Sequence, residues 1–67
     1  MITLEINGLK REVPEDTSLG HLIGILGLEP ERIAVELNEA IIPRAHYAQT
    51  PLAEGDSLEI VQFVGGG

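Results

Sequence analysis

Cysteine is absent from this 67-residue sequence, and aromatic residues are scarce, with one tyrosine and one phenylalanine. Without cysteine the chain cannot form a disulfide, a thiolate metal site or a cysteine nucleophile. The fold must therefore rest on aliphatic side chains, because 43% of the residues are hydrophobic. A chain of this length buries only about 60% of its unfolded surface, which leaves little room for a deep ligand pocket.

Long apolar runs are also missing. No stretch approaches the roughly 18 apolar residues that a membrane span needs, and no signal peptide precedes the first expected strand. We therefore expect a soluble, cytoplasmic protein that does not associate with membranes.

Basic residues are few. Four Lys and Arg stand against eleven Asp and Glu, which gives a formal net charge of −7. Phosphate backbones repel such a chain, so we expect no nucleic-acid partner. After residue 44 there is no Lys or Arg, while Glu54, Asp56 and Glu59 are acidic. These acids either serve solubility alone or face a partner with a basic surface, and the sequence leaves both interpretations open.

Recognisable catalytic patterns are missing as well. A Ser-His-Asp triad could be drawn only from scattered residues whose spacing does not recommend it, namely Ser18 or Ser57, His21 or His46, and Asp16 or Asp56. No pair of histidines has metal-ligand spacing, and no glycine-rich loop leads from a strand into a helix with a following lysine. We expect a protein that is not an enzyme and that binds no metal or cofactor itself.

The first third of the chain predicts a β-hairpin followed by a helix. Ile2, Leu4 and Ile6 alternate with polar residues, Asn7-Gly8 suits a two-residue turn, and Leu9 to Val13 would return as an exposed edge strand. A helical stripe follows at Leu19, Leu22, Ile23 and Leu26. Its N-cap is Asp16, Thr17 or Ser18, and Gly27 suits a left-handed C-cap.

Two glycines, Gly20 and Gly24, lie one turn apart inside this helix and beside its apolar stripe. Each costs about 1 kcal/mol relative to alanine, so each needs a structural reason. We expect both to allow close packing of the helix backbone on a sheet.

The second half predicts three more strands. They span Ile33–Leu37, Ala40–Ile42 after a turn at Asn38-Glu39, and Leu58–Val64, with one helical turn around Tyr47. Runs of strands interrupted by one helix indicate an α+β domain, and a right-handed crossover would set a late strand parallel to the first. We expect the ubiquitin-like β-grasp fold, a mixed sheet of four to five strands on one main helix. Its expected core is Ile2, Leu4, Ile6, Leu22, Ile23, Leu26, Ile33, Val35, Leu37, Leu58 and Ile60.

The sequence ends in Gly65-Gly66-Gly67, directly after the last strand. We expect residues 1–64 to form the domain and residues 65–67 to be a flexible tail. Glycines lack side-chain bulk and would let the tail enter a narrow channel in another enzyme. There the terminal carboxylate could attack the α-phosphate of ATP, and a sulfur or nitrogen nucleophile could then displace AMP from the acyl-adenylate.

Four stretches in this order resemble the ThiS family of sulfur carriers in thiamin biosynthesis. They are residues 34–38, 42–44, 52–56 and 59–67, and the likeness spans essentially the whole chain. The resemblance implies that Gly67, preceded by Gly65 and Gly66, is adenylated and becomes a C-terminal thiocarboxylate. One departure is Glu39, because many relatives place glycine after the asparagine of this turn.

The resemblance also implies the partners. They are a ubiquitin-activating-type (ThiF-like) adenylyltransferase that uses ATP, a sulfur donor such as the persulfide of a cysteine desulfurase, and a ThiG-like thiazole synthase. Two other interpretations stay open. One is the small subunit of molybdopterin synthase, and the other is a β-grasp interaction module whose tail is never activated.

Alternation along the last strand predicts the docking surface. If Leu58 and Ile60 face the helix, Glu59, Val61 and Phe63 lie on the opposite side of the sheet, with Val64 at the root of the tail. We expect these four residues to contact the partner. The alternative is a bulge at Gln62 that turns Phe63 back into the core.

Overall fold

A computed structural model describes residues 1–64 of the chain. The candidate reactive residues Gly65, Gly66 and Gly67 lie outside the described residues. The described elements are β1 (Ile2–Ile6), β2 (Leu9–Val13), α1 (Leu19–Ile25), the 3₁₀ segment η1 (Pro30–Arg32), β3 (Ile33–Leu37), β4 (Ala40–Ile42), the 3₁₀ segment η2 (Arg44–Gln49) and β5 (Ser57–Gln62).

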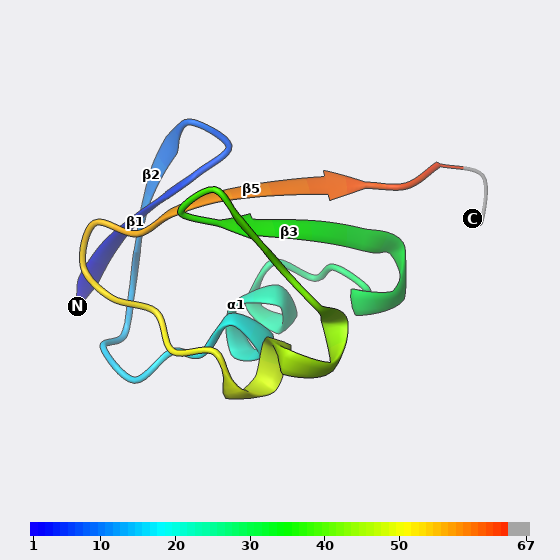
Figure 1. Cartoon of the computed structure of the whole chain (residues 1–67). Coiled ribbons are helices and arrows are strands. Elements are labelled where there is room, and N and C mark those ends of the chain that lie inside the picture. The colour runs from blue at the N-terminus through cyan, green and yellow to red at the C-terminus, as the bar shows by residue number, and fades with distance from the viewer. Residues whose placement is uncertain (65–67) are drawn as a thin grey trace.

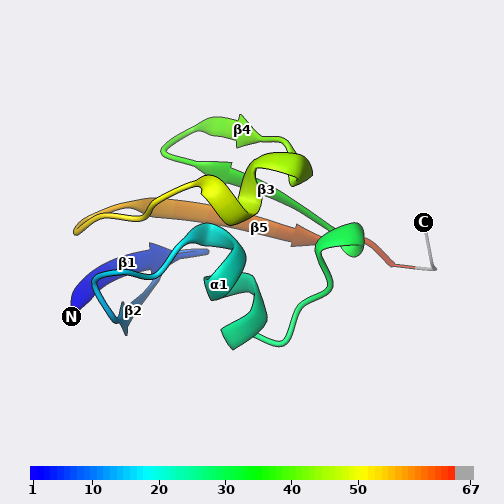
Figure 2. The ribbon, with the colours of Figure 1, turned by 90° about the horizontal axis from the view of Figure 1, so that it is seen from below.

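The five strands form one mixed sheet in the order β2-β1-β5-β3-β4. β1 pairs antiparallel with β2 and parallel with β5, while β3 is antiparallel to both β5 and β4. β5 is thus the late strand that was predicted to lie parallel to the first strand. Figures 1 and 2 show the sheet as one layer with α1 on one side of it. The predicted β-grasp architecture is confirmed.

Helix α1 begins at the third of the three candidate caps. The Ser18 side chain accepts a hydrogen bond of 3.1 Å from the His21 backbone N–H. Thr17 is instead buried, and its hydroxyl has no hydrogen-bond partner within residues 1–64. Gly27 follows the helix with φ +72°, the left-handed conformation expected of it. Within the described part of the chain, no helix has the length and apolar character needed to cross a membrane.

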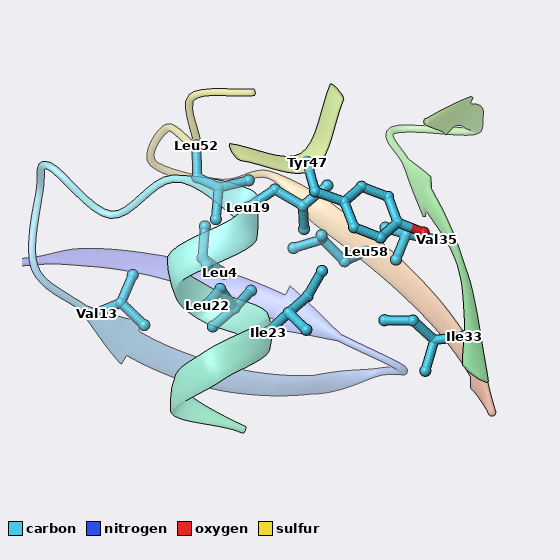
Figure 3. Packing of buried hydrophobic residues seen from close by; sticks show 10 residues of the cluster. All are labelled: Leu4, Val13, Leu19, Leu22, Ile23, Ile33, Val35, Tyr47, Leu52 and Leu58. Carbon is cyan, nitrogen blue, oxygen red and sulfur yellow. The ribbon is translucent and has the colours of Figure 1, made fainter. Parts of the chain in front are cut away.

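The core lies between α1 and the sheet, and η2 closes it on one side (Figure 3). The expected core residues divide into two groups. Leu4, Leu22, Ile23, Ile33, Val35 and Leu58 are buried, whereas Ile2, Ile6, Leu26, Leu37 and Ile60 pack against the core but stay half-buried. The second group is less buried because the seven-residue helix is too short to cover the whole sheet.

Four buried core residues were not on the expected list: Val13, Leu19, Tyr47 and Leu52. Tyr47 belongs to η2 and extends its ring toward β3 in Figure 3. Burial raises the pKa of the Tyr47 hydroxyl above its ordinary value of 10.0, and the positive charge of Arg44 partly opposes this shift. The single tyrosine therefore serves the fold as a protonated core residue at neutral pH.

The two helix glycines differ in their surroundings, so the prediction of a shared role is wrong. A Cβ built on Gly20 would lie 3.0 Å from the Ala48 Cα, because η2 crosses the helix at this point. The close neighbour is thus η2 and not the sheet. A Cβ on Gly24 would meet no heavy atom within 4 Å.

The substitutions Gly20→Ala and Gly24→Ala should therefore shift stability in opposite directions. Gly24→Ala should stabilise the domain by about 0.5–1 kcal/mol, because alanine restricts the unfolded chain and favours helix. Gly20→Ala should destabilise it by about 1–3 kcal/mol, because the methyl group has to displace backbone. The midpoints of urea unfolding measure both changes. A shift of the two midpoints in the same direction would contradict the assignment.

Candidate functional site: the outer face of the sheet and the end of β5

The last strand presents its apolar residues to both sides of the sheet, as the alternation predicts. Leu58 is buried and Ile60 is half-buried on the side of α1. Val61 and Phe63 are 58% and 48% exposed, and Val64 is 94% exposed. Phe63 is not part of the core cluster, so the alternative with a bulge that buries it is not supported.

Neighbouring strands extend this surface. Ala34 of β3 lies opposite Val61 of β5, and Ile41 of β4 is 77% exposed. We call Ala34, Ile41, Val61 and Phe63 the outer-face patch. A depression of about 350 Å³ beside Ala34, Ile41 and Val61 makes this face concave. Ile41 was not among the residues expected to contact a partner, although its alternation with half-buried Ile42 was a usable signal.

Acidic side chains border the patch on one side. Glu36 of β3 lies directly opposite Glu59 of β5, and Glu39 lines the same depression. Two like charges at opposed positions of a sheet disfavour each other by a fraction of a kcal/mol. Neither Glu36 nor Glu59 has an ion-pair partner in residues 1–64. This border is therefore suited to a basic surface.

The strand itself is shorter than predicted. β5 ends at Gln62, not at Val64, and Gln62 pairs with Ile33 at the last step of the β3–β5 ladder. One further bond follows, in which the Phe63 N–H donates to the Arg32 carbonyl at 2.7 Å. Beyond Phe63 the described backbone has no such anchor. The last fixed point before the glycines is therefore Phe63.

Two side chains extend the pairing of β5 with β1. The Asn7 amide donates to the Ile60 carbonyl at 3.1 Å and accepts from the Ile60 N–H at 2.7 Å, so it acts as an additional strand residue. At the other end, Glu54 Oε1 accepts from the Thr3 N–H at 2.9 Å. Asn7 thus anchors β5 beyond its backbone bonds with β1, and Glu54 ties the turn before β5 to β1, next to the bond from the Gly55 N–H to the Thr3 carbonyl.

Two of the three late acidic residues thus serve the fold. Besides Glu54, the Asp56 carboxylate accepts from the Asn38 amide at 3.0 Å and from the Ala53 N–H at 2.7 Å. Asn38 and Glu39 both have positive φ, as a tight hairpin turn requires. Glu39, at φ +72°, occupies the conformation for which glycine is better suited. Of the three acids, Glu59 alone remains for the outer face.

Two of the residues considered for catalysis serve the fold instead. Ser18 caps α1, and Asp56 holds the turn that precedes β5. In residues 1–64, no three His, Asp or Glu side chains are grouped so that they could hold a metal ion. The outer-face patch and the end of β5 are therefore the candidate site.

These features define a ubiquitin-like β-grasp domain with one open sheet face beside the strand that leads to its C-terminal glycines. The sequence model of the ThiS family matches residues 3–67, and the chain belongs to the ThiS family. A solved structure supports the same assignment. The crystal structure of the thiamine biosynthesis protein ThiS from Geobacter metallireducens superposes with a TM-score of 0.83 at 30% identity, covering 98% of this chain and all of that one.

Two kinds of curated relatives are similar to the chain. The sulfur carrier protein ThiS of Bacillus subtilis is 37% identical over 65 residues, which cover 96% of this chain and 98% of the relative. Thiazole synthases of Paramagnetospirillum magneticum and Magnetococcus marinus are 44% and 39% identical over 64 residues. The chain spans only a fifth of the length of these two relatives.

Proposed function

We propose that the chain is a sulfur carrier for the thiazole moiety of thiamin. The observation that carries this proposal is the correspondence with the Bacillus subtilis sulfur carrier over nearly the full length of both chains. The match to the family through residue 67 includes the three glycines, which supports Gly67 as the residue that carries the sulfur. Gly65 and Gly66 would give it access to a narrow active site.

The chemistry would take place in partner enzymes. A Gly67 carboxylate oxygen attacks the α-phosphorus of ATP in an adenylyltransferase, and pyrophosphate leaves. A persulfide sulfur then attacks the acyl carbon and displaces AMP, and a thiol cleaves the resulting disulfide to leave a thiocarboxylate. A thiazole synthase takes the sulfur from this group. The carrier itself would bind neither ATP nor any other cofactor.

The outer face would receive the activating enzyme. Exposed apolar patches commonly mark association surfaces, and this one lies beside the last anchored residue before the glycines. Val61, Phe63 and Val64 would supply the apolar contacts. Glu59 and Glu36 would face basic side chains of the enzyme. Their positive charge would offset the repulsion between the two carboxylates.

The variant Phe63→Ala should weaken binding to the activating enzyme by about 1–3 kcal/mol, as truncation of an aromatic anchor does. Its melting temperature should stay near that of the unchanged chain, because Phe63 lies outside the core. Titration calorimetry and thermal melts measure the two effects. Ile25→Ala is the matched control, because Ile25 is similarly exposed but lies on the helix. A Phe63→Ala protein that binds normally and melts early would show that the residue serves the fold instead.

A further inference from the structure

A second apolar surface lies on the opposite side of β5, between the tip of the β1–β2 hairpin and the end of α1. We call it the hairpin groove. It has a volume of about 460 Å³ and is lined by apolar residues that α1 leaves uncovered: Ile6, Leu9, Leu26, Leu28 and Ile60. Leu9 is 75% exposed. Gln62 also lines the groove, which therefore reaches the root of the glycine tail.

The charge of the hairpin groove is opposite to that of the molecule. Among its lining residues are Lys10 and Arg11, two of the four basic residues in the chain, and no Asp or Glu. Arg11 pairs with buried Leu4 and so lies on the helix side, whereas Lys10 pairs with Glu5 and points to the outer side. Arg11 has no ion-pair partner in residues 1–64. The groove is thus suited to a ligand with apolar groups and a carboxylate.

One wall of the hairpin groove is an open strand edge. β2 is an outermost strand of the sheet, with five residues against three in β4 at the other edge. An extended segment could add to this edge through backbone hydrogen bonds and place alternate side chains in the groove. A second copy of this chain is a poor occupant, because two β2 strands paired antiparallel about their central residue would place the two Arg11 side chains directly opposite each other.

We propose that the hairpin groove docks an extended, acidic and apolar segment of the thiazole synthase that consumes the sulfur. This inference rests on the proposed function, in which two enzymes need the same tail. The outer face serves the activating enzyme, and the groove stays accessible on the other side of β5. In two relatives a stretch homologous to this chain is part of the same polypeptide as the rest of a thiazole synthase, which fits a close association.

The test measures binding of the carrier to the thiazole synthase of the same organism by biolayer interferometry. Leu9→Ser and Arg11→Glu should each weaken binding by about tenfold or more, and higher salt should weaken the unchanged carrier more than Arg11→Glu. Arg44→Glu is the matched control, because Arg44 begins η2 after β4, at the opposite edge of the sheet, and its reversal should leave binding unchanged. Thermal melts confirm that each variant is folded.

Hydrogen exchange tests the groove assignment independently of the binding measurements. Strand addition predicts that alternate backbone amides within residues 9–13, those that face away from β1, gain protection when the synthase binds. Unchanged binding of Leu9→Ser and Arg11→Glu, or no added protection in β2, would overturn the inference, and so would a Leu9-dependent dimer of the carrier alone. Thiocarboxylate formation by the unchanged carrier distinguishes a failure of the groove assignment from a failure of the proposed function. If it forms while the groove variants bind normally, only the groove assignment fails, and if it never forms, the proposed function fails.

Discussion

A variant that lacks Gly67 should form no thiocarboxylate, yet unfold at the same temperature as the full chain. The deletion moves the carboxylate back by one residue, about 3.5 Å, and even a 1 Å misplacement of reacting groups can slow a reaction by about a hundredfold. The fold should not respond, because the buried core lies within residues 4–58 and the last backbone anchor is at Phe63.

The absence of cysteine makes the thiocarboxylate straightforward to identify by mass spectrometry. After incubation with ATP, the activating enzyme and a persulfide donor, the exchange of one oxygen for sulfur changes the intact mass by nearly the same amount as oxidation of Met1. Alkylation with iodoacetamide distinguishes the two products, because the chain has no cysteine thiol to compete. Gly67→Ala is the control that keeps the carboxylate in place and should retain part of the reaction. Activation of the deletion variant at the normal rate, or a large loss of stability, would contradict the assignment.

The largest loss of stability should come from Leu22→Ala. Leu22 is fully buried at the centre of α1, and truncation of such a residue leaves a cavity that costs about 3–5 kcal/mol. The total stability of a small domain can be about 5 kcal/mol, so this variant should be near its unfolding midpoint in buffer. Urea unfolding in an excluded osmolyte such as trimethylamine N-oxide keeps the transition measurable.

Leu26→Ala is the matched comparison for Leu22→Ala. Leu26 has the same side chain and follows α1 by one residue, but it is only half-buried beside the hairpin groove. Its truncation should cost about 1–2 kcal/mol, because the site is already open to water. Equal losses for the two variants would show that α1 covers the groove in solution.

The parts of the fold that follow from local pattern could be predicted from the sequence. Alternation placed Val61 and Phe63 on the outer face, and Asn7-Gly8 and Gly27 marked turns whose residues have the expected positive φ. The helix stripe at Leu19, Leu22 and Ile23 is buried as a periodic pattern requires. These properties depend on residues close together in the chain.

What the sequence could not predict depends on contacts between distant segments. Gly20 is needed because η2 crosses the helix at Ala48, and no local pattern announces that crossing. Asn7 was expected only as a turn residue, but its amide also pairs with Ile60, fifty-three positions away. The hairpin groove exists because α1 ends at Ile25 and leaves Ile6 and Ile60 partly uncovered, and helix ends are hard to place from sequence.

The bond from the Phe63 N–H to the Arg32 carbonyl fixes the point from which the reach of the following residues is measured. Four residues follow Phe63, and fully extended they span at most about 14 Å. With Gly67 as the reacting residue, each enzyme that uses this tail must hold its reacting atom within that distance of the point where β5 is fixed. The activating enzyme and the thiazole synthase would therefore need channels of matching depth, although they perform unrelated chemistry. A change in tail length would have to be matched in both enzymes at once.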